Sequence, residues 1–277
     1  MPGINLILNN LKSGLDLFYQ IPRALITIEG EDARTFLQRM STNDLNNLTK
    51  SKPIQSSFTD NKGKMIDHCV IFSMTPSKFN LVSSHGDASV LCNWLEQYHF
   101  VEDFSLSKNH DQLPISMVIT TANYEDDASC LSCWQGHLND LIVNFYIMLR
   151  KPEGALAIDQ KCFETLRIAA LMPTSPNEIN QTVMPHNIGL DRFIADNKGC
   201  YIGQEVIAKA RVYQKRVKKL SGVTLTPEQF AKFDENIHTK DHALGTITSV
   251  APYFVSHFMN ALVLGYALVD DHVSSLY

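Results

Sequence analysis

The chain contains 277 residues, of which 44% are hydrophobic and 19% are charged, and its formal net charge is −5. This composition is typical of a globular protein and excludes an intrinsically disordered chain. The negative charge gives the chain no overall attraction to nucleic acid or to an anionic membrane. With roughly 150 residues per domain as a guide, the length predicts two domains or one large one.

Targeting and membrane signals are not recognisable in the sequence. Residues 1–20 contain Asp16 and lack the apolar core and cleavage site of a secretory signal. The longest apolar run, 141–149, is broken by Asn144 and is too short to span a bilayer. The six cysteines lack the regular spacing of a disulfide framework. We therefore expect a cytoplasmic protein with reduced thiols and no membrane partner.

Helices and strands alternate in the first part of the chain. Residues 32–40 are predicted to form a helix, because Phe36, Leu37 and Met40 share one face. Residues 64–74 are rich in Ile, Val and Phe and predict a strand that pairs with residues 79–82. The hydrophobic spacing further predicts a helix at 88–98, strands at 115–121 and 141–149, and a helix at 164–171. This alternation predicts an α+β body built from sheet-and-helix units.

Residues 198–205 read Lys-Gly-Cys-Tyr-Ile-Gly-Gln-Glu, and we call this segment the octet. It combines a thiol, an ammonium group, an amide and a carboxylate, a mixture that packing alone does not require. In a helix each of its two glycines costs about 1 kcal/mol relative to Ala. The glycines therefore indicate tight backbone geometry or the close approach of another molecule. The polar groups indicate that something is bound there.

The position of Cys200 within the octet has an electrostatic consequence. Residues 196–197 read as a turn, and the sequence after it predicts a helix that begins near Tyr201 or Ile202. Such a helix places Cys200 at its N-terminus, where unpaired N–H groups and the helix dipole favour a thiolate. Lys198 acts in the same direction. The alternative is a buried, inert thiol, which is common for free cysteines.

The segment after the octet is basic and then strand-rich. Its basic part contains six cations, namely Lys209, Arg211, Lys215, Arg216, Lys218 and Lys219. These cations have three possible roles: a solvated surface, an anion site or a phosphate contact with RNA. Tyr213 is the only aromatic residue among these cations, so base stacking has little support. Strands are predicted near 216–225, 243–250 and 261–269, and together they favour a small C-terminal β-barrel. We place the domains at 1–211 and 212–277.

Other chemical motifs are weak or absent. Cys130 and Cys133, with His137 nearby, have the spacing of half a metal site or of a redox pair. A structural zinc site uses four ligands, and the sequence offers no second Cys-x-x-Cys. The ten histidines form no His-Glu-x-x-His cluster, and no phosphate-binding loop or Gly-x-Ser-x-Gly motif occurs. No permanently bound metal is predicted.

The octet matches every position of the signature Lys-Gly-Cys-Tyr/Phe-x-Gly-Gln-Glu. The chain thereby resembles the YgfZ-type folate-binding proteins, which are relatives of the aminomethyltransferase (GcvT) of the glycine cleavage system. Residues 28–44, 59–65 and 167–191 also resemble the family, so the likeness runs from about residue 20 to the end. The resemblance implies a GcvT/YgfZ-like folate-binding body of sheet-and-helix units, followed by a compact β-barrel.

The resemblance also implies a function. It predicts a tetrahydrofolate-binding accessory protein that acts in iron–sulphur cluster assembly or repair, with effects on cluster-dependent tRNA modification. Cys200 is then the candidate functional thiol, in contact with a cluster, a sulphur donor or a one-carbon adduct of folate. One cysteine cannot hold a cluster, which usually needs about four thiolates. The expected partners are therefore transient: the cluster assembly machinery or client enzymes that contain clusters.

Folate is expected to contact residues in and near the octet. Gln204 and Glu205 offer an amide and a carboxylate that match the donor–acceptor edge of a pterin, or else they cap the local fold. Asp44 has the alternative role of a helix or turn cap. Arg211 would receive the carboxylates of the folate glutamate tail, although Gln214 stands where relatives often have Gly. The full set of expected folate-binding residues is Lys198, Tyr201, Gln204, Glu205, Asn43, Asp44 and Arg211.

The alternative function is that of a folate-dependent aminomethyltransferase or another one-carbon transferase. Such an enzyme needs a carboxylate near the one-carbon centre to direct proton transfer. The corresponding stretch here is residues 81–87, which lacks the Asn of the transferases but ends in Asp87. The chain is also shorter than those enzymes, so whether it is an enzyme stays open. A pure tRNA-binding module is disfavoured by the negative net charge.

Overall fold

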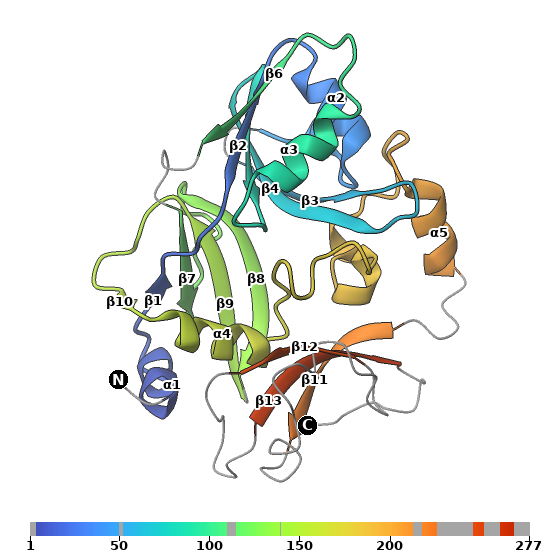
Figure 1. The fold of residues 1–277 in the computed structure, drawn as a ribbon. Coiled ribbons are helices and arrows are strands. Elements are labelled where there is room, and N and C mark those ends of the chain that lie inside the picture. The colour runs from blue at the N-terminus through green and yellow to red at the C-terminus, as the bar shows by residue number, and fades with distance from the viewer. Residues whose placement is uncertain are drawn as a thin grey trace. The chain divides into compact units, whose positions relative to one another are not determined.

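A computed structural model describes residues 4–49, 52–109, 115–138, 140–212, 218–225, 246–251 and 261–268 (Figure 1). The chain divides into two compact units, and each unit is built from segments that are distant in sequence. Unit 1 consists of Met1–Gln20, Ser116–Pro173 and Lys215–Tyr277, and unit 2 consists of Ile21–Ile115 and Thr174–Gln214. The domain division at residue 211 stays a prediction.

Unit 2 is centred on a five-stranded antiparallel sheet with the order β3-β4-β5-β2-β6. The strands are β2 (Leu25–Glu29), β3 (Ile54–Thr59), β4 (Met65–Thr75), β5 (Lys78–Ser83) and β6 (Ser105–Asn109). Helices α2 (Ala33–Met40) and α3 (Ser89–Glu96) pack against this sheet. The 3-10 helices η1 (Leu45–Asn47), η2 (Pro185–Ile188) and η3 (Asp191–Phe193) and helix α5 (Gln204–Val212) complete the unit.

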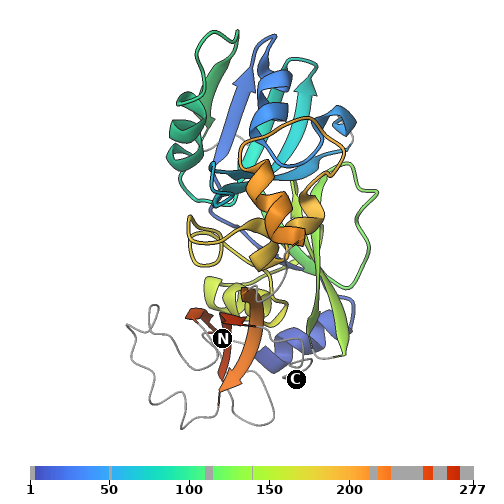
Figure 2. The same cartoon turned by 90° about the vertical axis from the view of Figure 1, so that its right-hand side faces the viewer.

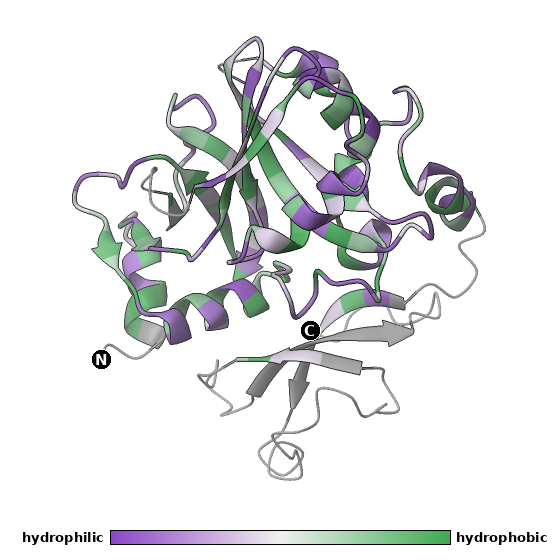
Figure 3. Cartoon of the chain, turned by 45° about the horizontal axis from the view of Figure 1, so that its top comes forward, coloured by the Kyte–Doolittle hydropathy of each residue, from purple (hydrophilic) through white to green (hydrophobic). Residues whose placement is uncertain are grey.

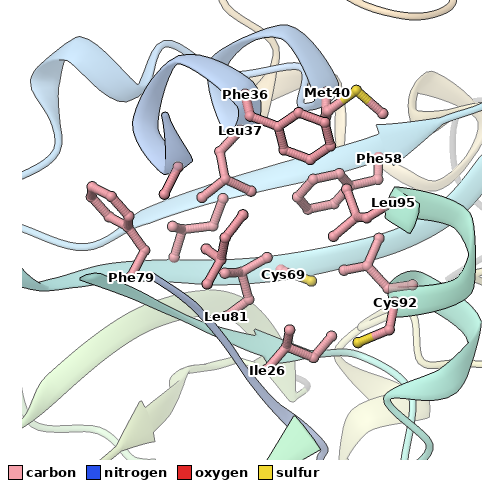
Figure 4. Packing of buried hydrophobic residues seen from close by; sticks show 14 of the residues in the cluster. Ile26, Phe36, Leu37, Met40, Phe58, Cys69, Phe79, Leu81, Cys92 and Leu95 are labelled. Carbon is pink, nitrogen blue, oxygen red and sulfur yellow. The ribbon is translucent and has the colours of Figure 1, made fainter. Parts of the chain in front are cut away.

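The core of unit 2 follows from the hydrophobic spacing of its helices. Phe36, Leu37 and Met40 form the buried face of α2, as their spacing predicts. They meet Phe58 of β3 and Leu95 of α3 in one cluster (Figure 4). In a view that colours residues by hydropathy, the strands are largely green and the helices show both colours (Figure 3). Helices with one apolar face therefore cover a buried sheet.

Unit 1 contains a second five-stranded sheet with the order β10-β1-β7-β9-β8. Its strands are β1 (Leu17–Tyr19), β7 (Ser116–Thr120), β8 (Cys130–Leu138), β9 (Leu141–Met148) and β10 (Leu156–Ala157). Helices α1 (Ile4–Lys12) and α4 (Gln160–Ala169) belong to the same unit. The C-terminal strands β11 (Lys218–Leu225), β12 (Thr246–Val250) and β13 (Ala261–Leu268) form an antiparallel sheet with the order β11-β13-β12.

The structure confirms the mixed α+β character that the sequence predicts and corrects some of its elements. Helix α4 begins at Gln160, earlier than predicted, because the Asp159 side chain accepts a hydrogen bond from the Cys162 N–H and caps it. Strand β8 was not predicted from the sequence. In the C-terminal segment the described residues form an open three-stranded sheet, so closure into a barrel stays a prediction.

Candidate functional site

The octet leads directly into α5, which faces the viewer as the orange helix in Figure 2. The helix begins at Gln204, and the Gly203 carbonyl accepts its first hydrogen bond, from the Ile207 N–H at 3.0 Å. The prediction of a start near Tyr201 or Ile202 is therefore wrong. Cys200 lies ahead of the helix rather than at its N-terminus, which removes the helix-dipole argument for a thiolate. Its side chain is exposed, so the alternative of a buried thiol is wrong too.

The two glycines of the octet have different surroundings. Gly203 has a φ of +83°, and a Cβ built on it would lie 2.5 Å from the Asp60 carbonyl oxygen. Only glycine fits there, because the conformation is left-handed and the backbone approach is close. At Gly199, in contrast, a built Cβ meets no atom within 4 Å. Close packing within the protein therefore explains Gly203, whereas open space surrounds Gly199.

The partner of Gly203 is the turn between β3 and β4. Asp60 Oδ1 accepts hydrogen bonds from the N–H groups of Lys62 and Lys64, each at 2.8 Å, which closes the turn. Gly63 occupies the turn with a φ of +71°, and a Cβ built on it would lie 3.0 Å from Ile207 Cγ1. The Thr59 hydroxyl donates to the Ile202 carbonyl at 2.7 Å. The turn thus holds the octet in place.

Lys198 joins the octet to the loop after α2. Its ammonium group donates to the carbonyl oxygens of Gln38 at 2.7 Å and Asn43 at 2.8 Å, and also to that of Ser41. An ammonium has three N–H donors, and these contacts use all of them. The carbonyls lie at and just beyond the C-terminal end of α2, where a cation is favoured by the helix dipole. Burial lowers the pKa of Lys198 to about 8, against the opposing charge of Asp44.

The loop that contains Asn43 and Asp44 is fixed by its own polar side chains. Asn43 donates its side-chain amide to the Gln55 carbonyl at 2.8 Å. Asp44 Oδ1 accepts from the Asn46 N–H at 3.0 Å, which caps η1, and from the Gln38 amide at 2.9 Å. These hydrogen bonds, that from Asn46 first, lower the pKa of Asp44. The cap role considered for Asp44 is confirmed, and its contact with folate stays a prediction.

The remaining predicted site residues lie on or beside α5. Glu205 is exposed and pairs with Lys209 at 2.6 Å, an interaction that lowers the pKa of Glu205. Arg211 forms an ion pair with Asp196 at 2.5 Å. Tyr201 is buried, which raises the pKa of its phenol, and its ring centroid lies 5.3 Å from the Lys198 ammonium. Gln204 is half-buried at the first position of the helix. The structure thus brings Lys198, Asn43 and Asp44 together through hydrogen bonds.

A buried polar cluster in unit 2 was missed at the sequence level. Asp67 of β4 is fully buried, and its carboxylate accepts from the hydroxyls of Ser83 and Ser84, each at 2.5 Å. Its neighbour His68 contacts the Ser57 hydroxyl at 3.0 Å. Burial, with help from the charges of Arg23 and Arg192, lowers the pKa of His68 to about 3. The signal in the sequence was an adjacent Asp and His inside an apolar strand.

Asp87, considered above as a remnant of a transferase carboxylate, lies at the start of α3. Its Oδ1 accepts a hydrogen bond from the Ser89 N–H at 2.8 Å, and its side chain is on the surface. This contact satisfies one of the donors that a helix leaves unpaired at its N-terminus. The geometry therefore gives Asp87 a local structural role.

Two further observations concern metals and membranes. Within the described ranges, no three His, Cys, Asp or Glu side chains gather in a way that could hold a metal ion. None of the described helices combines the length and the apolar character needed to cross a bilayer.

The N-terminal part of the chain is similar to a known protein family. Residues 11–121 match a family model described as the GCVT N-terminal domain. Over this range the chain is similar to GcvT. The matched range includes the Asn43–Asp44 loop, the turn at Gly63 and the Asp67 cluster.

The curated proteins to which the chain is similar include aminomethyltransferases. That of Aquifex aeolicus is 24% identical and covers 79% of this chain and 67% of its own length. That of Geobacillus sp. is 22% identical, with 80% of this chain and 71% of the relative covered. That of Thermoanaerobacter pseudethanolicus is 19% identical, with 91% and 77% covered.

A solved structure shares the fold. It is the crystal structure of glycine cleavage system aminomethyltransferase T from Bartonella henselae, which matches with a TM-score of 0.64 at 14% identity. The match covers 92% of this chain and 79% of that one. At this identity the likeness concerns the fold alone.

Proposed function

We propose that this protein binds tetrahydrofolate and acts in folate-dependent one-carbon transfer of the aminomethyltransferase type. The similarity to aminomethyltransferases along 79–91% of the chain supports the proposal. The observation that carries it is the Lys198 ammonium, which ties the octet to the Asn43 carbonyl 155 residues earlier in the chain. Two segments that resemble those of folate-binding relatives are thereby held together.

Residues of the octet and of α5 support this proposal by their chemistry. Gln204 is half-buried and offers a donor and an acceptor to a pterin edge. Gly199 leaves open space where any other residue would place a Cβ, so a flat ring can approach the backbone there. Arg211 and Lys209 are cations on the same helix and suit the carboxylates of a glutamate tail. Bound tetrahydrofolate would supply the nitrogen atoms that accept or release the one-carbon unit.

In this proposal Lys198 positions the octet and does not bind folate. All three of its N–H donors are directed at backbone carbonyls. Asp44 likewise caps η1 and orders its loop. The contacts with folate then come from Gln204, Gly199 and the cations of α5, with Asn43, Tyr201 and Glu205 at the margin.

A second candidate function is that of a folate-binding accessory protein in iron–sulphur cluster assembly or repair. It is favoured by Cys200, which is the exposed member of the six cysteines. An exposed thiol outside a helix suits transient contact with a cluster or a sulphur donor. In this function the partners are the assembly machinery or cluster-containing clients in the cytoplasm, and tRNA modification is affected through those clients.

Titration with tetrahydrofolate and its polyglutamates tests the property that both functions share. We expect saturable binding by calorimetry, and tighter binding as glutamates are added. A purified protein that gives no saturable heat with either ligand would contradict both candidates.

Replacement of the thiol separates the two functions. Cys200→Ala is expected to leave aminomethyl transfer and folate binding intact if one-carbon transfer is the function. If cluster repair is the function, Cys200→Ala in a deletion strain lowers the activity of cluster-containing enzymes, while folate binding is unchanged. Cys162→Ala, at a buried thiol, is the matched control for loss of a cysteine.

A further inference from the structure

The octet enters α5 through a tight turn at residues 201–204. The Gln204 N–H donates to the Tyr201 carbonyl at 3.2 Å, and Gly203 has a φ of +83°. Among the described non-glycine residues only Leu171 has a positive φ, so Ile202 has a negative one. A turn closed in this way, with a positive φ at its third residue alone, is of type II.

The Thr59 hydroxyl binds the peptide group that defines this turn type. Types I and II differ by a rotation of the central peptide, so the Ile202 carbonyl points in opposite directions in the two types. Thr59 is the fully buried last residue of β3, and its hydroxyl donates to the Ile202 carbonyl at 2.7 Å. A Cβ built on Gly203 would lie 2.9 Å from the same hydroxyl oxygen. Glycine accepts either turn type, and the hydroxyl therefore favours type II.

The turn type in turn decides where α5 begins. In the type II turn the left-handed Gly203 interrupts the helical conformation, and the helix starts at Gln204. A type I turn would give Gly203 a nearly helical conformation, so the helix would extend back toward Ile202. That earlier start is the one expected from the sequence. Gln204 would then lie within the first helical turn instead of at its first position, and its amide would be presented differently.

We propose that Thr59 is a positioning residue for the folate site, because its hydroxyl selects the type II turn and thereby sets the direction of the Gln204 amide. The inference rests on the proposed function, in which Gln204 contacts the pterin. Thr59 acts through Gln204 and does not touch the ligand, since its side chain is buried and its single O–H donor is directed at the Ile202 carbonyl.

Calorimetric titration with tetrahydrofolate tests this role in two Thr59 variants and one control. Thr59→Val replaces the hydroxyl with a methyl group, and we expect it to weaken binding at least about tenfold. Thr59→Ser keeps the hydroxyl and should bind within about threefold of the wild type. Thr27→Val is the matched control, because it removes a buried hydroxyl of the same sheet that donates to Asn80 Oδ1 at 2.7 Å. It should lower stability and leave the affinity unchanged.

A double-mutant cycle shows whether Thr59 acts through Gln204. In a Gln204→Ala background, Thr59→Val should change the affinity by less than about twofold, because the group that it positions is gone. Thermal unfolding keeps the comparison possible in a less stable variant, since tetrahydrofolate should raise the melting temperature of Thr59→Ser more than that of Thr59→Val.

The outcomes separate the positioning role from the proposed function. Binding to the wild type with equal affinity in Thr59→Val, or a full loss in the Gln204→Ala background, would overturn the role of Thr59 alone. A wild-type protein that does not bind tetrahydrofolate would overturn the proposed function, and this inference with it.

Discussion

Single residues hold the candidate site together, and Lys198 is the clearest case. Its side chain is 8% exposed, and its ammonium group satisfies carbonyl oxygens that α2 and the following loop leave without partners. A charge is costly to bury unless it is paired and hydrogen-bonded. Lys198 is therefore best explained as a positioning residue for the octet, although sequence reasoning assigned it to the ligand.

The buried ammonium gives a first prediction. Lys198→Met keeps the aliphatic stem but leaves buried carbonyl oxygens unsatisfied, at about 1–3 kcal/mol for each such group. We expect the free energy of unfolding to fall by about 3 kcal/mol in guanidinium denaturation. Lys209→Met, at an exposed ion pair, should change it by less than about 1 kcal/mol. Equal effects of the two variants would show that the three carbonyl contacts contribute little.

The two glycines of the octet give a second prediction. Gly203→Ala forces a Cβ to 2.5 Å from the Asp60 carbonyl in a left-handed conformation. We expect a loss of at least about 2 kcal/mol of unfolding free energy, since the conformation alone costs about 1–2 kcal/mol. Gly199→Ala should change stability by less than about 0.5 kcal/mol, because its surroundings are open. Thermal and guanidinium unfolding of both variants measure the difference, and a stability loss at Gly199 like that at Gly203 would contradict the geometry.

His68 gives a prediction about pH. Its pKa is lowered from 6.5 to about 3 in the folded protein, so the unfolded chain binds more protons between these values. The contribution of His68 to stability is therefore complete above pH 6.5 and is lost as the pH falls toward 3. The slope reaches about 1.4 kcal/mol per pH unit. His68→Gln should flatten this slope in denaturation curves across the acid range, whereas exposed His137→Gln should not. An unchanged slope in His68→Gln would show that another group causes the acid sensitivity.

At the scale of elements, helices and strands with a regular apolar spacing were predicted from the sequence. Elements in which a bulge or a left-handed residue interrupts that spacing were missed or misplaced. Helix α2 and strand β4 were predicted almost to their observed ends, because apolar spacing and the Ile-, Val- and Phe-rich run are local signals. Strand β8 was missed, since its bulge breaks the alternation of apolar residues. The start of α5 was misplaced, because the left-handed Gly203 excludes a helix that continues through it. The contacts of Lys198 span up to 160 residues of sequence and no local pattern reports them.

At the scale of the whole molecule, the chain interleaves two units, and each is built from segments that are distant in sequence. One boundary in the sequence, placed where the composition changes, cannot describe units that are each made of separate segments. The octet indicated the YgfZ-type relatives of the aminomethyltransferases. The comparisons support the GcvT-like part of this prediction, and the YgfZ-type assignment stays a prediction. The expected folate-binding residues remain predictions, and the structure supplies the positions from which they can be tested.

The central claim is that tetrahydrofolate binds at the octet, beside Gly199. It is tested most directly by calorimetric titration of tetrahydrofolate into the wild-type protein and Gly199→Ala, a variant expected to fold as well as the parent. We predict saturable binding to the wild type and an affinity at least about tenfold weaker in Gly199→Ala, a difference of about 1.4 kcal/mol. Absence of saturable binding to the wild type would contradict the folate proposal, and equal affinity in the two proteins would contradict its location at the octet.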